Sequence, residues 1–311
     1  MSPKHGIGKR PPTGLGAIPD TAEEQAKRQK RMARFQEAVL PDDKAPKQAS
    51  AAGSRVRGSS QAIEKPYFRL TAAPDLATVR PPSMLKLALR HVQQHWIQHA
   101  DYKYACEQLK SIRQDLTVQH IQNGLAVRVY ETHARIAIEE GDLAEFKQCL
   151  AVLRPLHSRG VKGNAEEFVM YALLHAAAAS PKQLAIDMRD VPRDLWQHPF
   201  LQHALQVCKT VCHQDARGLV RLYADAPRMA PYLMDPMLER LRKHCAAVMH
   251  AYSGPVPLSS AATILCFDTR KEVAKFWQSC NGEVDRKRKV LPFKRSGSRE
   301  QATAGQSVVS T

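Results

Sequence analysis

The stretch "DYKYACEQLKSIRQDLTVQ" (101–119) has the pattern of an amphipathic helix. Leu109, Ile112 and Leu116 recur at steps of three and four residues, which places them on one side of a helix. Asp115, like most other charged residues of the stretch, is expected to lie mainly on the remaining sides. The pattern therefore predicts a core helix with a solvated charged surface, and not a reaction centre.

Three charged residues of this stretch are predicted to have definite structural partners. Glu107 and Lys110 are expected to form an ordinary ion pair on the helix surface, worth a few tenths of a kcal/mol. Arg113 is expected to reach the next helix near Glu131 or His133 and to fix how the two helices cross.

Similar helical patterns continue on both sides of this stretch. Asp101, Asp142 and Asn164 each stand before an apolar helical pattern, where residues of their type commonly cap a helix. No stretch between 84 and 252 alternates cleanly with a period of two. The sequence therefore predicts an all-α, TPR-like right-handed stack of short antiparallel helices. No strict sequence period assigns it to a standard repeat class.

The pattern changes after residue 253. "GPVPLS" (254–259) is predicted to be extended, and "SAATILCF" (260–267) and "DTRKEVAKFWQSC" (268–280) to be short helices, the second capped by Asp268. Two short strand-like pieces flank the turn "RKRK" (286–289). Helix, strand, helix, helix and two-stranded wing is the order of a winged-helix domain, in which the third helix and the wing commonly meet nucleic acid.

The net charge of +16 is concentrated at the two ends of the chain. Residues 1–66 carry 13 Lys and Arg against 7 Asp and Glu, and residues 281–311 carry 7 against 3. The segment 67–280 carries 26 against 20 over a much greater length. Basic ends on a mildly basic body favour an acidic partner such as nucleic acid, an anionic surface or an acidic protein.

The basic wing and the helix before it are the predicted nucleic-acid site. Six of the ten residues at 286–295 are basic, and two lysines lie four residues apart on the preceding helix. The predicted site consists of Lys271, Lys275, Arg286, Lys287, Arg288, Lys289, Lys294 and Arg295. Such a cluster can neutralise several phosphates, so binding should weaken steeply with salt and should read little sequence. The competing interpretation is a nuclear import signal, and both roles are compatible.

Residues 1–66 are rich in Pro, Gly, Ser, Ala and Lys, a composition that predicts a disordered basic arm. One segment, "TAEEQAKRQKRMARFQEAVL" (21–40), has a helical composition within this arm. Its basic cluster is a nuclear-localisation or nucleic-acid candidate, although a solvated charge run is an equally good interpretation. The cluster consists of Lys27, Arg28, Lys30, Arg31 and Arg34.

The sequence holds no motif of an enzyme, cofactor or metal site. No phosphate-binding glycine loop, HExxH or paired-carboxylate motif occurs, and Cys106 with His133 is a poor candidate for a nucleophile and its base. Cys208 and Cys212 lack the second pair of ligands that a structural zinc site needs. No apolar run has the ~18–20 residues of a membrane span, and the N-terminus lacks the apolar core of a signal peptide. We therefore expect a non-enzymatic protein without cofactor or membrane contact, with its seven cysteines reduced.

Several long segments resemble the Sac-three/GANP family of messenger-RNA export and processing factors. The resemblance covers roughly 65–295, in the order of the family, and points to the branch of leukocyte receptor cluster member eight and yeast Thp-three. The segments are "YFRLTAAPDLATVRPPSML" (67–85), "DYKYACEQLKSIRQDLTVQ" (101–119), "VYETHARIAIEEGDLAEFKQC" (129–149), "GNAEEFVMYALL" (163–174), "RLYADAPRMAPYLMD" (221–235) and "PVPLSSAATILCFD" (255–268).

The resemblance implies a fold and a mode of action. It implies a PCI-like domain, with a disordered arm at 1–66, a helical-repeat part at 67–252, a winged helix at 253–295 and a disordered tail at 296–311. Such proteins pair with a PCI-domain partner that a small acidic Sem/DSS-type protein braces, and the paired winged helices present a basic surface to RNA or DNA. The resemblance also implies a nuclear adaptor of transcription elongation, splicing or export.

Two features separate this sequence from its family and leave a rival function open. "HIQNGLAV" (120–127) stands where a more acidic and aromatic run is expected, and the wing is short and unusually basic. The rival is a scaffold subunit of a PCI-type complex without nucleic-acid contact. Such a subunit does not need six basic residues within 286–295.

Overall fold

The computed structural model describes residues 56–251 and 255–280, together with residues 284, 285, 290 and 291 and helical residues 26, 29, 30, 32 and 33. The described residues divide into two compact units. The first unit lies within 1–208 and 222–235, and the second within 209–221 and 236–311. The predicted domain boundaries at 66, 252 and 295 stay predictions.

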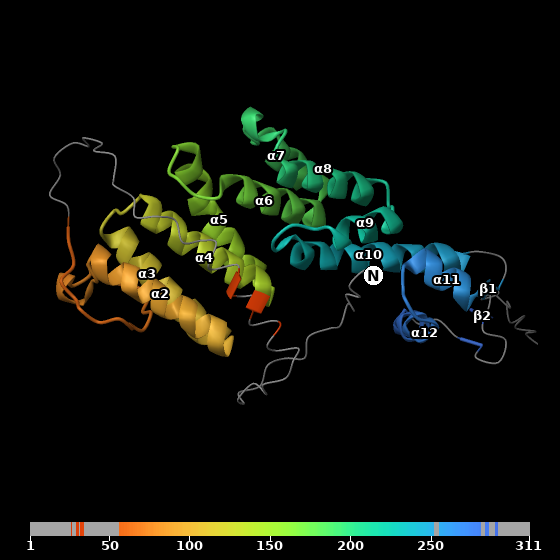
Figure 1. Ribbon diagram of the computed structural model, residues 1–311, viewed down its shortest axis with the longest axis horizontal. Coiled ribbons are helices and arrows are strands. Elements are labelled where there is room, and N and C mark those ends of the chain that lie inside the picture. Colours follow the sequence, from red (N-terminus) through yellow and green to blue (C-terminus); the bar gives the residue numbers. More distant parts are fainter. Residues whose placement is uncertain are drawn as a thin grey trace, which may run out of the picture. The chain divides into compact units, whose positions relative to one another are not determined.

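The described chain is mostly helical, as the sequence predicts (Figure 1). Each of the helices α2 to α6 packs against the next one along the chain. The elements before the C-terminal part are η1 (Leu76–Thr78), α2 (Pro82–His99), α3 (Tyr102–Val118), α4 (Gly124–Glu140), α5 (Leu143–Ser158), α6 (Ala165–Ala179), α7 (Pro181–Arg189), η2 (Arg193–Leu195), α8 (Pro199–Cys212), α9 (Ala216–Ala224) and α10 (Ala230–Ala251). Among the described helices, none has the length and apolar character of a membrane span.

The predicted helix caps at Asp101 and Asp142 are present. Each carboxylate accepts a hydrogen bond from the backbone N–H three residues further on, at 3.1 and 2.9 Å. Asn164 precedes α6 as predicted, but its side chain makes no cap hydrogen bond. Its backbone N–H and its Nδ2 instead donate to the two carboxylate oxygens of Glu131, both at 2.7 Å. Asn164 therefore links the start of α6 to α4.

Polar side chains connect each helix from α2 to α5 with the second helix after it. These links are mostly buried, and two of them join an arginine to a buried glutamate. The pairs are Gln93–Thr132 (α2 to α4, 3.1 Å), Arg113–Glu145 (α3 to α5), Arg135–Glu167 (α4 to α6, 2.8 Å) and Arg154–Asp187 (α5 to α7, 3.0 Å). Apolar packing joins consecutive helices, and these polar links fix how alternate helices sit beside one another.

Arg113 has the role that the sequence predicts for it. Its Nη1 lies 3.0 Å from His133 Nδ1 on α4 and also bonds Glu145 Oε1 on α5. Lys110 does not follow its prediction, because its Nζ pairs with Glu145 Oε2 at 2.8 Å instead of with Glu107. Burial explains the difference, since the carboxylate of Glu145 is only 3% exposed and gains more from a cation than an exposed glutamate does.

The expected position of Asp115 on a solvated side of its helix is wrong. Its side chain is 1% exposed and pairs with Arg80 Nε at 2.6 Å and with Lys65 Nζ at 2.8 Å. The same polar cluster fastens Gly58, whose N–H donates to Gln119 Oε1 at 3.1 Å. Residues 56–66, assigned to the arm by the sequence, therefore lie against α3. The charge of Asp115 can be buried because Lys65 of this segment and Arg80, just before α2, supply its counter-charges.

The second unit carries the elements predicted after residue 253. These are β1 (Val256–Pro257), α11 (Leu258–Leu265), α12 (Arg270–Ser279) and β2 (Val290–Leu291). The strands are antiparallel, with Val256 opposite Leu291 and Pro257 opposite Val290. Asp285 also bridges to Val290, through backbone hydrogen bonds of 3.0 and 3.2 Å. Within the described residues, the element order and the pairing agree with the predicted succession of strand, two helices and strand.

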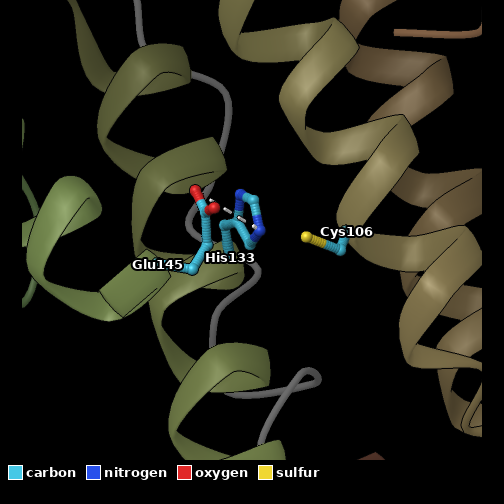
Figure 2. A group of neighbouring side chains, drawn as sticks. All are labelled: Cys106, His133 and Glu145. Carbon is cyan, nitrogen blue, oxygen red and sulfur yellow. Dashed lines mark ion pairs between the residues drawn. The ribbon is translucent and has the colours of Figure 1, made fainter. Parts of the chain in front are cut away.

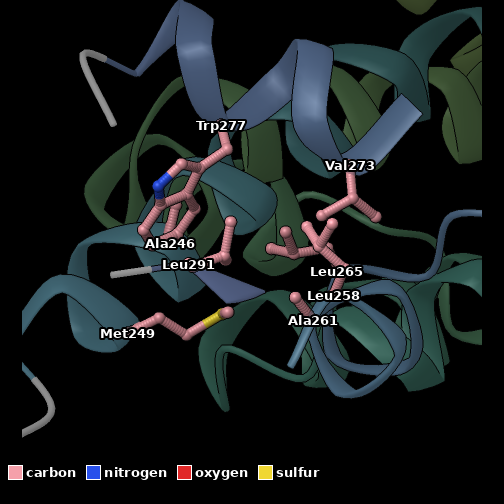
Figure 3. Close-up of a cluster of buried hydrophobic side chains, with 8 residues drawn as sticks. All are labelled: Ala246, Met249, Leu258, Ala261, Leu265, Val273, Trp277 and Leu291. Atoms are coloured by element: carbon pink, nitrogen blue, oxygen red, sulfur yellow. The ribbon is translucent and has the colours of Figure 1, made fainter. Parts of the chain in front are cut away.

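A small apolar core holds these elements together (Figure 3). It takes residues from the end of α10, from α11 and α12, and from β2. The buried members are Ala246, Met249, Leu258, Ala261, Leu265, Val273, Trp277 and Leu291. Trp277 and Val273 lie one helical turn apart on α12, so this helix is fixed along a single face.

The link between α3 and α5 yields a stability prediction. Arg113→Met removes the guanidinium and leaves Glu145 buried beside Lys110 alone, so we expect the free energy of unfolding to fall by about 3–5 kcal/mol. Urea denaturation followed by circular dichroism measures the change. Lys243→Met is the matched control, because its pair with Glu239 is solvent-exposed and its loss should change the stability far less. Equal stabilities of the two variants would contradict the assignment.

Candidate functional site

The exposed face of α12 carries two of the predicted nucleic-acid residues. Lys271 and Lys275 are both exposed and lie one turn apart, on the side of the helix opposite Val273 and Trp277. Gln278 is also exposed and continues the same face by a further turn. Two lysines at this spacing can meet successive phosphates of a strand without reading its bases.

The start of α12 differs by one residue from the prediction. Thr269, and not Asp268, is the cap: its Oγ1 accepts from the backbone N–H of Glu272 at 3.2 Å. The Glu272 carboxylate in turn accepts from the backbone N–H of Thr269 at 3.1 Å. This reciprocal capping box satisfies two backbone donors and fixes the end of α12 that carries Lys271.

Arg242 of α10 fixes the connection between α11 and α12. Its Nε donates to the carbonyl of Leu265 at 2.9 Å and its Nη2 to that of Cys266 at 2.7 Å. The guanidinium carbon lies 4.1 Å from the centre of the Phe267 ring. The cation therefore satisfies carbonyls at the end of α11, where the helix dipole favours positive charge. Nothing in the sequence indicates this role, because Arg242 lies in a charged run and its partners are backbone atoms.

The remaining predicted site residues lie almost entirely outside the described residues. These are Arg286, Lys287, Arg288, Lys289, Lys294 and Arg295 of the wing, and Lys27, Arg28, Arg31 and Arg34 of the arm. Of the arm cluster the structure describes Lys30, which is helical and exposed. The residues on either side of the wing run, Asp285 and Val290, are paired with each other.

A second cluster has the residue types of a catalytic or metal centre. Cys106 of α3, His133 of α4 and Glu145 of α5 point toward one another, with their ligand-type atoms within 4.8 Å of one another (Figure 2). Lys110 and Arg113, however, bond the two carboxylate oxygens of Glu145. Two cations at this position repel a metal ion and occupy the carboxylate that would bind it.

The protonation states of these side chains also indicate a structural role. Burial and the neighbouring Arg113 lower the pKa of His133 to about 3, so His133 is neutral and a weak base near pH 7. Beside the cluster, the Cys149 thiol of α5 lies 3.3 Å from Arg113 Nη1, and burial raises its pKa to about 12. Burial opposes ionisation of Glu145, but hydrogen bonds from Lys110 and Arg113 lower its pKa below the usual value. The ion pair of Arg113 and Glu145 and the neutral imidazole of His133 therefore form a buried contact between α3, α4 and α5.

The depressed pKa of His133 predicts a dependence of stability on pH. The unfolded chain binds a proton at this histidine below about pH 6.5, whereas the folded chain does so only near pH 3. The contribution of neutral His133 to the free energy of unfolding should therefore be fully present above about pH 6.5 and should fall as the pH decreases. Between pH 7 and pH 5 this residue alone should lower the free energy of unfolding by about 2 kcal/mol. Urea denaturation of the wild type and of His133→Gln at both pH values tests this. An unchanged pH dependence in His133→Gln would contradict it.

Comparison with known proteins places the chain in a family. The sequence profile of the SAC3/GANP family matches residues 21–148 and 139–286. The chain is 36% identical over 270 residues to a THP3 homolog of Schizosaccharomyces pombe, with 85% of this chain and 68% of that relative covered. It is also 36% identical over 271 residues to the leukocyte receptor cluster member 8 homolog of Xenopus laevis, with 82% and 34% covered. The chain belongs to the SAC3/GANP family, and the predicted branch is confirmed.

The relatives differ greatly in length. The match to protein THP3 of Saccharomyces cerevisiae, 42% identical over 124 residues, covers 39% of this chain and 26% of that protein. The chain thus spans about two thirds of the fission-yeast relative, a third of the frog relative and a quarter of the budding-yeast protein. What those whole proteins do is not carried over to this chain by similarity alone.

Proposed function

We propose that this protein is a non-enzymatic nuclear adaptor of messenger-RNA biogenesis that pairs with a PCI-domain partner and binds RNA or DNA through its C-terminal unit. Membership of the SAC3/GANP family supports a role in messenger-RNA metabolism. The observation that carries the nucleic-acid part is the solvent-exposed lysine pair of α12, followed in the sequence by the basic run 286–289.

The architecture of the second unit supports a winged helix as the binding module. β1 pairs with β2, and Asp285 pairs with Val290, which is the strand arrangement that a wing requires. The buried face of α12 fixes the helix through Val273 and Trp277, so the opposite face is free to meet a ligand. In winged-helix proteins the corresponding helix and wing contact nucleic acid.

The proposed partners follow from the same interpretation. A PCI-domain protein would pair with the C-terminal unit, and a small acidic Sem/DSS-type protein would join through that partner. The other function to be distinguished is a scaffold subunit of a PCI-type complex that never contacts nucleic acid. Fluorescence anisotropy with labelled single-stranded RNA, measured for the protein alone and with its co-expressed PCI partner, separates the two. Binding that is absent or independent of salt in both samples would favour the scaffold.

The lysine pair gives a quantitative test. Lys271→Ala with Lys275→Ala removes two phosphate contacts, so the slope of log affinity against log salt should become shallower by about 1.4 for single-stranded RNA. Replacing Arg286 to Lys289 with Ala should weaken binding further and leave the helical circular-dichroism signal unchanged.

A control with the same charge change is available in the first unit. Lys103 and Lys182 are exposed there, and replacing both with Ala lowers the net charge by the same two units. This variant should keep the wild-type salt slope. If it weakens binding as much as the α12 variant does, binding depends on net charge and the proposed site is wrong.

A further inference from the structure

The segment before α2 forms a loop whose two ends are joined by backbone hydrogen bonds. The N–H groups of Ser59 and Ser60 donate to the carbonyls of Leu76 and Val79, at 3.2 and 2.9 Å. Gly58 packs so closely here that an added Cβ would lie 2.1 Å from the Val79 carbonyl oxygen. Only glycine allows this approach, so the contact closes residues 61–78 into a loop.

Polar contacts anchor this loop on α3. Arg80 donates to Asp115 at 2.6 Å and to the carbonyl of Ile63 at 2.9 Å. The backbone N–H of Lys65 donates to Gln108 Oε1 at 3.1 Å, and Gln114 Nε2 donates to the carbonyl of Phe68 at 2.8 Å. The loop is thus anchored at several points along its length.

The outer surface of this anchored loop is unusually apolar. Large hydrophobic side chains that a folded chain normally buries are exposed here, and Phe68 is 72% exposed. The others within or next to the loop are Val56, Ile63, Tyr67, Leu70 and Leu76, each 39–46% exposed. Since the loop is held in place, it presents these side chains in a fixed arrangement. Phe68 and Leu70 line the same hollow, and exposed apolar side chains that lie together in this way commonly mark an interaction site.

A hollow of about 460 Å³ lies between this loop and α3. Pro66, Phe68 and Leu70 line it on one side and Val118 on the other. No backbone–backbone hydrogen bond joins residues 61–74 to another described residue. Side chains bond the peptide groups of residues 62, 63, 65 and 68, and the groups of residues 69–74 remain available to a second chain. An extended peptide can use such groups for affinity and the hollow for specificity.

The charges around the hollow favour a protein partner over nucleic acid. Four of its lining residues are charged, and Lys65 and Asp115 pair with each other, which leaves Arg69 and Asp75 with no net positive charge to attract phosphate. Arg69 is exposed between Phe68 and Leu70, where it can pair with a carboxylate of a bound peptide. We propose that the loop 61–78 and its hollow bind an extended partner segment in which large apolar side chains alternate with carboxylates. This site lies in the first unit and is independent of the nucleic-acid site proposed for the second.

A synthetic peptide and two matched variants test this site. The probe is a short fluorescein-labelled peptide in which Leu and Phe alternate with Asp, measured by anisotropy. Phe68→Ser with Leu70→Ser should weaken its binding at least about tenfold, because two anchors that bury apolar area are lost. Leu87→Ser is the control, since Leu87 is 45% exposed on α2, close to the 46% of Leu70, but does not line the hollow. This control should bind like the wild type, and circular dichroism should show that both variants are folded.

Four results would overturn the proposal. The first is no binding of the peptide to the wild-type protein at about millimolar concentration. The second is equal binding by the double variant and the Leu87→Ser control. The third is equally tight binding of a peptide with Lys in place of Asp, which would show that Arg69 does not pair with a carboxylate of the peptide. The fourth is loss of single-stranded RNA binding or of self-association in the double variant alone, which would assign the surface to nucleic acid or to a second copy of the chain.

Discussion

Buried pairs of arginine and carboxylate determine the arrangement of the first unit. Arg113 with Glu145 and Arg135 with Glu167 each connect a helix to the second helix after it. Apolar side chains pack each helix against its neighbour, but such contacts are not directional and permit sliding. A charged hydrogen bond has a defined length and direction, and breaking it leaves a buried charge that costs several kcal/mol. These pairs therefore favour one arrangement of these helices, although the sequence has no strict repeat.

Periodicity and capping residues predict the helices of this protein well, because both signals are local. The caps at Asp101 and Asp142 and the inward positions of Leu109 and Ile112 follow from the sequence of one helix alone. The pattern of a single helix wrongly predicts a solvated position for Asp115 for the same reason. Its counter-charges come from residues 35 and 50 positions away in the chain, and no single-helix pattern contains them. The prediction for Arg113 is confirmed, because it lies beside the inward apolar stripe and its acceptors are on the next two helices.

The C-terminal unit shows the same division between local and distant signals. The exposed position of Lys271 and Lys275 follows from the helical pattern that also buries Trp277. Arg242, by contrast, acts on backbone carbonyls of a different helix, and those carbonyls have no sequence signal. The apolar core of this unit is small, so the arginine adds a directional contact where packing is limited. In both units a buried or half-buried arginine positions a helix.

The claim that buried ion pairs fix the helical stack is tested most directly by a double-mutant cycle on Arg135 and Glu167. The two bonds between them are both 2.8 Å, and the pair is buried. Free energies of unfolding are measured for the wild type, Arg135→Met, Glu167→Gln and the double variant. Each single change leaves one partner without its bidentate contact, so we predict a coupling energy of about 2–3 kcal/mol, with the double variant far less destabilised than the sum of the single changes. A coupling energy below about 0.5 kcal/mol would contradict the account, because the two side chains would then stabilise the stack independently of each other.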